Sequence, residues 1–97
     1  MLFVFYILDK PGTSEQRLAL RSAQYEHLGK VEAQMKIGGP LLAEDGKTMT
    51  GSLLVIDFED REAAQAWLDE APFTTGGVFG EAKIHAYTQN WPRRNTS

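Results

Sequence analysis

Residues 2–8 read LFVFYIL, an apolar run of aromatic and β-branched side chains that residues 9–12, Asp-Lys-Pro-Gly, bring to an end. Aromatic and β-branched residues are enriched in strands, and the run is far shorter than the roughly 20 residues a membrane-spanning helix needs. Both alternating sets of side chains in it are apolar, so both faces of the strand should be covered. The run predicts a buried first strand rather than a membrane anchor or a secretory signal.

A long helix and an irregular strand are predicted next. Good helix formers dominate residues 15–35, where Leu20, Leu28, Val31 and Met35 share one arc, so we expect one amphipathic helix with Gly29 as its weak point. Residues 36–42 predict a short strand. The Gly-Gly-Pro at its centre is expected to interrupt the pairing there.

The second half of the chain repeats this alternation of strand and helix. Residues 51–58 have strand composition and follow a turn that contains Asp45-Gly46. Asp60 is expected to cap a second helix and Pro72 to end it. The alternation over residues 78–88 predicts a fourth strand. Residues 1–90 are therefore predicted to form one domain and residues 91–97 a tail.

The order β-α-β-β-α-β predicts an α+β fold, a ferredoxin-like plait with a four-stranded antiparallel sheet and both helices on one face. The first strand is apolar on both faces, and two helices cover only one of them. A second copy packed on the bare face would bury it, so we expect a homodimer or a higher homo-oligomer.

The amino-acid composition argues against several classes of binding partner and cofactor. The 97 residues carry a net charge of -3 and no cysteine. An acidic chain lacks the basic footprint of nucleic-acid binding and the attraction to anionic membranes. Without thiolates or clustered ligands we expect no metal, and without phosphate-loop spacing no nucleotide cofactor. A cytoplasmic protein with a small-molecule partner, or with none, is expected.

Gln24 breaks the apolar face of the predicted first helix. At about 100° per residue its amide falls in the middle of the apolar arc. A buried amide without partners costs roughly 1 to 3 kcal/mol, so Gln24 needs structural hydrogen bonds or a cavity. Arg21 and His27 flank it, each about one turn away. A site at this seam and a purely structural role both remain open.

The chain also carries seven short segments in a fixed order: residues 2–12, Arg17-Leu18 with Arg21, Gly39-Pro40-Leu41, Gly51-Ser52, residues 62–67, Pro72-Phe73 and residues 77–79. The set resembles the YciI-like (YCII-related) proteins over nearly the whole chain before Asn90. The resemblance implies a dimeric α+β barrel with a pocket between helix and sheet and a His-Asp active site. In this chain Gln24 stands at the signature histidine position, and Ala71 stands where the family has aspartate.

Three functions follow. The first is a small-molecule pocket protein that binds a polar or anionic ligand, without the family's acid-base pair. The second is an isomerase-like or lyase-like enzyme that uses His27 or Asp9 as its base. The third is a structural or accessory oligomer. The residues predicted to bind the ligand are Asp9, Arg21, Gln24, Ser52 and Phe73, with His27 as the candidate catalytic residue.

Overall fold

The structure, a computed structural model, describes residues 1–93. Its elements are β1 (Leu2–Asp9), α1 (Ser14–Gly29), the 3-10 turn η1 (Glu32–Gln34), β2 (Met35–Leu42), β3 (Met49–Asp57), α2 (Arg61–Asp69), α3 (Pro72–Thr75) and β4 (Phe79–Tyr87). The predicted order is confirmed, with η1 and α3 as additional short turns. Residues 94–97 of the predicted tail lie outside the described residues.

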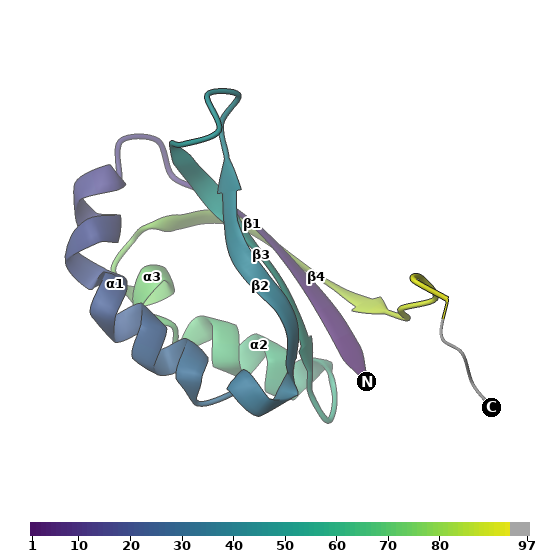
Figure 1. The fold of residues 1–97 in the computed structure, drawn as a ribbon. Coiled ribbons are helices and arrows are strands. Elements are labelled where there is room, and N and C mark those ends of the chain that lie inside the picture. The colour runs from purple at the N-terminus through teal and green to yellow at the C-terminus, as the bar shows by residue number, and fades with distance from the viewer. Residues whose placement is uncertain (94–97) are drawn as a thin grey trace.

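The four strands form one antiparallel sheet in the order β2-β3-β1-β4. The helices lie on one side of it, and α1 runs along the sheet beside β2 (Figure 1). The predicted ferredoxin-like α+β arrangement is therefore confirmed. Because β1 lies between β3 and β4, it needs apolar side chains on its helix-covered face, and the sequence supplies them.

An aromatic cluster fills the space between sheet and helices. The ring of Phe5 is fully buried and packs edge-on against Trp67 of α2, with 5.5 Å between ring centroids, and against Phe58 at 5.9 Å. Leu54 and Ile84 are the partners of Phe5 on the neighbouring strands, and both are buried. Burying one such side chain stabilises a fold by about 1.5 to 3 kcal/mol, so this cluster anchors α2 to the sheet.

The prediction of one helix over residues 15–35 is wrong at its end. The helix α1 ends at Gly29, η1 follows, and Met35 already belongs to β2, opposite Ile56. Glycine costs about 1 kcal/mol more than alanine inside a helix, which favours an end at this position. Val31 is buried nevertheless, because the turn keeps it facing the core.

The predicted interruption of β2 at Gly38-Gly39-Pro40 is also wrong. Pairing with β3 continues through these residues, and Pro40 lies opposite Ser52. The irregularities fall instead near Met35 and near Leu41 and Leu42. Because β2 is an edge strand, a proline without an N–H group fits there without removing a central ladder bond.

The second helix begins and ends near the predicted residues. The side chain of Asp60 accepts a hydrogen bond from the backbone N–H of Ala63 at 2.8 Å, as a cap does. Pro72, expected only to end a helix, also occupies the first turn of α3, where its missing N–H has no intrahelical partner to lose. The segment predicted as a loop after Pro72 is thus partly helical.

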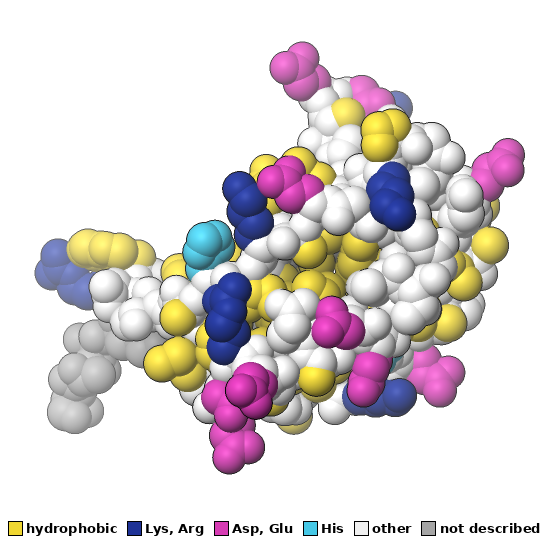
Figure 2. All heavy atoms as spheres, turned by 180° about the vertical axis from the view of Figure 1, so that it is seen from behind, with side chains coloured by type: hydrophobic (Ala, Val, Ile, Leu, Met, Phe, Trp, Pro, Cys, Tyr) yellow, Lys and Arg dark blue, Asp and Glu magenta, His cyan; other side chains and the backbone are white. Residues whose placement is uncertain are grey.

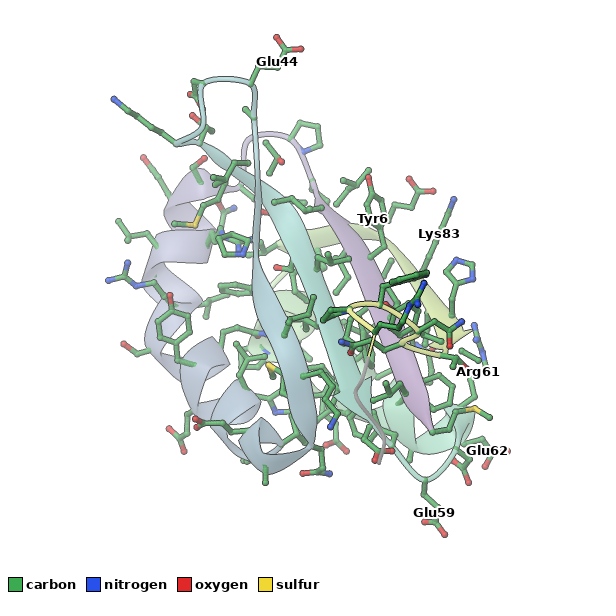
Figure 3. The ribbon with its side chains drawn as sticks, turned by 45° about the vertical axis from the view of Figure 1, so that its right-hand side comes forward. Tyr6, Glu44, Glu59, Arg61, Glu62 and Lys83 are labelled. Carbon is green, nitrogen blue, oxygen red and sulfur yellow. The ribbon has the colours of Figure 1, made fainter. Side chains whose placement is uncertain are left out.

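The face of the sheet away from the helices has exposed aromatic and aliphatic side chains. Tyr6 is 44% exposed, Ile37 58% and Tyr87 40%. Tyr6 and Lys83 extend from the sheet on the side away from α1 (Figure 3). Figure 2 shows another side of the molecule, behind the view of Figure 1, where Lys and Arg side chains are interspersed with Asp and Glu around hydrophobic ones. Within residues 1–93, no helix is long and apolar enough to cross a membrane.

Candidate functional site

The side of α1 that faces the sheet is polar along part of its length. Gln24 is 3% exposed and His27 6%, and these two are the buried residues of the helix. Arg17, two turns before Gln24, is also withdrawn from solvent. Buried polar groups need partners or a ligand, so this stripe marks the site.

A pocket of about 240 Å³ lies between α1, the edge strand β2, its neighbour β3, and α3. Its lining is Arg17, Arg21, Gln24, Tyr25, Leu28, Met35, Gly38, Gly39, Pro40, Met49, Ser52, Leu54 and Phe73. Apolar side chains make most of the walls, and four polar ones converge from α1 and β3. Such a combination is typical of small-molecule sites.

Arg17 connects three parts of the structure at this pocket. Its Nη1 donates to Oδ2 of Asp9 at 2.7 Å, which forms an ion pair between α1 and the end of β1. Its Nη2 lies 3.4 Å from both the backbone oxygen of Gly51 and the Oγ of Ser52, on β3. The guanidinium also lies over the ring of Phe73, 4.9 Å from its centroid. Arg17 is therefore fixed in position before any ligand arrives.

Asp9 is a buried carboxylate with an incomplete set of partners. Its side chain is 9% exposed, and within residues 1–93 its Oδ1 has no hydrogen-bond partner. Burial raises the pKa of Asp9 above the ordinary value of an aspartate, and the Arg17 guanidinium offsets part of that rise. The Asp9–Arg17 pair leaves little net charge at the inner end of the pocket.

The side-chain amide of Gln24 makes a hydrogen bond to the backbone through its oxygen, and Gln24 also lines the pocket. Its Oε1 accepts a hydrogen bond from the backbone N–H of Phe73 at 3.0 Å, at the start of α3. This bond satisfies an N–H that α3 itself cannot pair. The amide group of Gln24 also lines the pocket, so its NH₂ is available to a ligand oxygen.

His27 lies elsewhere. Its Nε2 donates to the backbone oxygen of Trp67 at 2.8 Å, and its ring stacks on the Trp67 indole with 4.8 Å between centroids. His27 is not among the residues that line the pocket. Its hydrogen bond and stacking join α1 to α2, which is a structural role, and the catalytic role predicted for it has no support in this geometry.

The structure brings four of the predicted site residues together: Arg21, Gln24, Ser52 and Phe73 all line the pocket. Asp9 does not line it and lies behind Arg17. Sequence reasoning missed Arg17 as a site residue. The signal was present, because residues 17 and 24 are seven apart and so share one face of a helix.

Among residues 1–93, no three His, Cys, Asp or Glu side chains come together as metal ligands would. The groups that do converge are two guanidinium groups, an amide and a hydroxyl, all of which donate hydrogen bonds. The nearby carboxylate of Asp9 does not line the pocket and forms an ion pair with Arg17. This arrangement is suited to holding oxygen atoms of a ligand.

Known proteins are similar to this chain in sequence. Residues 1–88 match the sequence model of the YCII-related domain. The chain is 34% identical to the protein YciI of Escherichia coli O6:H1 over 94 residues, with 90% of this chain and 96% of that protein covered. An uncharacterized protein of Haemophilus influenzae is 29% identical over the same coverage.

A solved structure is also similar. It is the 5-chloro-2-hydroxyhydroquinone dehydrochlorinase (TftG) of Burkholderia phenoliruptrix AC1100, in complex with 2,5-dihydroxybenzoquinone. The TM-score is 0.83 at 29% identity, and the match covers 91% of this chain and 94% of that one. The fold is therefore that of a small-molecule binding or enzyme-like protein. By the match over residues 1–88 and the shared identity, this chain belongs to the YCII-related domain family.

Proposed function

We propose that this protein binds a small polar or anionic molecule in the pocket between α1 and the sheet. The observation that carries the proposal is the convergence of polar side chains on one cavity of about 240 Å³ whose walls are mostly apolar; these side chains are Arg17, Arg21, Gln24 and Ser52. Apolar walls contribute affinity, whereas a few fixed donors select for oxygen atoms at defined places. No metal or cofactor is needed for this binding.

The dehydrochlorinase with a similar structure supports this ligand class. Its ligand, 2,5-dihydroxybenzoquinone, is a flat ring that carries carbonyl and hydroxyl oxygens. A ring of this kind suits a pocket walled by Leu28, Met35, Leu54 and Phe73, with hydrogen-bond donors at one side. This ligand is therefore the first probe to test.

Binding without catalysis is the form of the proposal that we favour. Gln24 lines the pocket, but its amide does not ionise near neutral pH and cannot act as a general acid or base. Ala71, at the predicted aspartate position of the family, is fully buried and has no polar side chain. Neither residue supplies an acid or a base, so hydrogen bonding and shape carry the recognition.

Filling the pocket should abolish binding. Ser52 is 8% exposed and its side chain faces the cavity, so Ser52→Leu places a larger apolar side chain where the ligand would lie. We expect titration calorimetry with 2,5-dihydroxybenzoquinone to detect binding to the parent protein and at least about a hundredfold weaker binding to the variant. Ser22→Leu, the same change on the exposed side of α1, is the control and should bind like the parent. Equal affinity in the two variants would remove this pocket as the site.

The alternative is an enzyme that uses His27 as its base. The structural contacts of His27 predict instead that His27→Ala lowers the free energy of unfolding by about 2 kcal/mol, through the lost hydrogen bond and packing, and leaves ligand affinity unchanged. Chemical denaturation and calorimetry measure the two quantities. Turnover that is present in the parent and absent in a folded His27→Ala variant would establish the enzyme.

Gln24→His is a second test of whether this protein is an enzyme. The substitution restores the residue that the family resemblance places there, inside the pocket. Turnover of a screened metabolite by this variant alone would mean that the chain keeps the pocket and has lost the chemistry. Absence of any ligand for parent and variants alike would favour the structural oligomer.

We further propose that two copies pair through the sheet face away from the helices. By the register of the strands, the side chains of Tyr6, Ile37 and Tyr87 lie on this face, and all three are exposed within residues 1–93. Light scattering at micromolar concentration is expected to give the mass of a dimer or a larger oligomer. A stable folded monomer under these conditions would refute the proposal.

A further inference from the structure

A second cavity, of about 270 Å³, opens beside the ligand pocket, between the N-terminal half of α1 and the hairpin that joins β2 to β3. Its lining is Ser14, Arg17, Leu18, Arg21, Lys47, Thr48 and Met49. Arg17, Arg21 and Met49 line both cavities. The two cavities therefore adjoin, and we call them the inner and the outer part of the site.

The two parts differ in charge. At the inner part, the charge of Arg17 is balanced by Asp9 at 2.7 Å. At the outer part, Arg21 and Lys47 form no ion pair with any group in residues 1–93. No Asp or Glu is among the residues that line either cavity. Two uncompensated positive charges thus stand at the outer part of a chain whose net charge is -3.

The two acidic side chains of the hairpin, Glu44 and Asp45, do not line the outer cavity. The Asp45 carboxylate accepts hydrogen bonds from the backbone N–H groups of Lys47 and Thr48, both at 2.8 Å, and from the Thr48 hydroxyl at 2.6 Å. Asp45 therefore fixes the turn that presents Lys47 and Thr48. Glu44, at the tip of the hairpin, points away from the molecule (Figure 3).

Arg21 is held at the junction of the two parts. Its guanidinium lies over the ring of Tyr25, one turn along α1, at 6.0 Å from the ring centroid. Both residues line the inner pocket, and Arg21 lines the outer cavity as well. A guanidinium in this position can reach an acid group at the outer part while the rest of a ligand lies inside.

We propose that the ligand is an amphiphilic carboxylic acid, with its carboxylate held in the outer cavity by Arg21 and Lys47 and its apolar ring in the inner pocket. This inference rests on the proposed function and adds the class and the orientation of the ligand. Neutral oxygens of the ligand meet Gln24 and Ser52, which are uncharged hydrogen-bond donors, beside an Arg17 whose charge Asp9 balances. The carboxylate goes outward, where two positive charges have no partner.

Benzoate and benzyl alcohol test the proposal, since they share a ring and differ in charge. At low salt, we expect NMR titration to show that benzoate binds about tenfold more tightly than benzyl alcohol. The preference should shrink to less than about threefold in Arg21→Gln and in Lys47→Gln. Lys47 lines only the outer cavity, so Lys47→Gln should leave the affinity for benzyl alcohol unchanged. Lys30→Gln removes the same charge at the far end of α1 and should keep the full preference.

The outcomes separate this inference from the proposed function. Equal affinity of the two probes, or a preference that survives both variants, overturns the carboxylate subsite and leaves the pocket in place. Binding of 2,5-dihydroxybenzoquinone without any binding of benzoate does the same. Failure of all three probes overturns both proposals.

Discussion

Replacing Arg17 with methionine is expected to destabilise the protein by about 3 kcal/mol at pH 7, because it leaves the Asp9 carboxylate buried without its partner. Methionine keeps an apolar stem against the Phe73 ring, so packing changes less than charge. The measurement is the free energy of unfolding from urea titration, compared with the parent. The same variant should bind 2,5-dihydroxybenzoquinone more weakly, since Arg17 lines the pocket.

The free energy of unfolding lost in Arg17→Met should be smaller at low pH than at pH 7. Burial already raises the pKa of Asp9, and removing Arg17 removes the group that opposes the rise. A carboxyl whose pKa is higher in the folded than in the unfolded state stabilises the fold at low pH, and this contribution is lost as pH rises through the folded pKa. The deficit of Arg17→Met relative to the parent should therefore shrink as pH falls toward about 4, the ordinary range for aspartate.

The double variant Asp9→Asn with Arg17→Met is the control for this interpretation. With no ionisable group left at either position, it should be more stable than Arg17→Met at pH 7 and should lack the pH-dependent deficit. A single variant whose deficit is the same at pH 4 and pH 7 would show that lost packing, rather than the buried charge, explains the effect.

Phe5→Ala should cost about 3 to 5 kcal/mol of unfolding free energy, a large share of the stability of a domain this size. Phe5 is fully buried at the centre of the sheet, and its ring contacts Phe58 and Trp67. Alanine removes the ring and leaves a cavity that β1, held between two strands, cannot close by moving. Urea denaturation with tryptophan fluorescence measures the loss.

Leu18→Ala is the matched control for Phe5→Ala. Leu18 is 68% exposed on α1, so its truncation removes little buried area and should change stability by less than about 0.5 kcal/mol. A loss for Phe5→Ala that is no larger than that of Leu18→Ala would contradict the central position assigned to Phe5.

Periodicity predicted the interior of the fold well. The apolar pattern of residues 2–8 predicted a buried strand, and β1 lies inside the sheet, between β3 and β4. The alternation of Ala82, Ile84 and Ala86 with Lys83 and His85 matches the register of β4, where Ile84 lies opposite Phe5. The register of β4 follows from the alternation of side chains between the two faces of a strand, which the sequence displays directly.

Local sequence propensity did not predict the pairing of β2 or the end of α1, because contacts between distant residues set both. Pro40 and its neighbouring glycines indicated a break, yet β2 pairs through them because an edge strand leaves one side of its backbone free. Gly29 was recognised as a weak point of the helix. That the helix ends there depends on Met35 pairing with Ile56, which is a contact between distant residues.

The same division applies to the site. By itself the sequence determined that a polar side chain, Gln24, would face the sheet, since helix geometry fixes which residues share a face. Only the tertiary structure decided which groups meet there. It put Arg17 between Asp9 and Ser52, and it bonded His27 to Trp67 outside the pocket. The reason is physical: a helical period gives direction around one axis, whereas a pocket depends on distances between elements that packing alone sets.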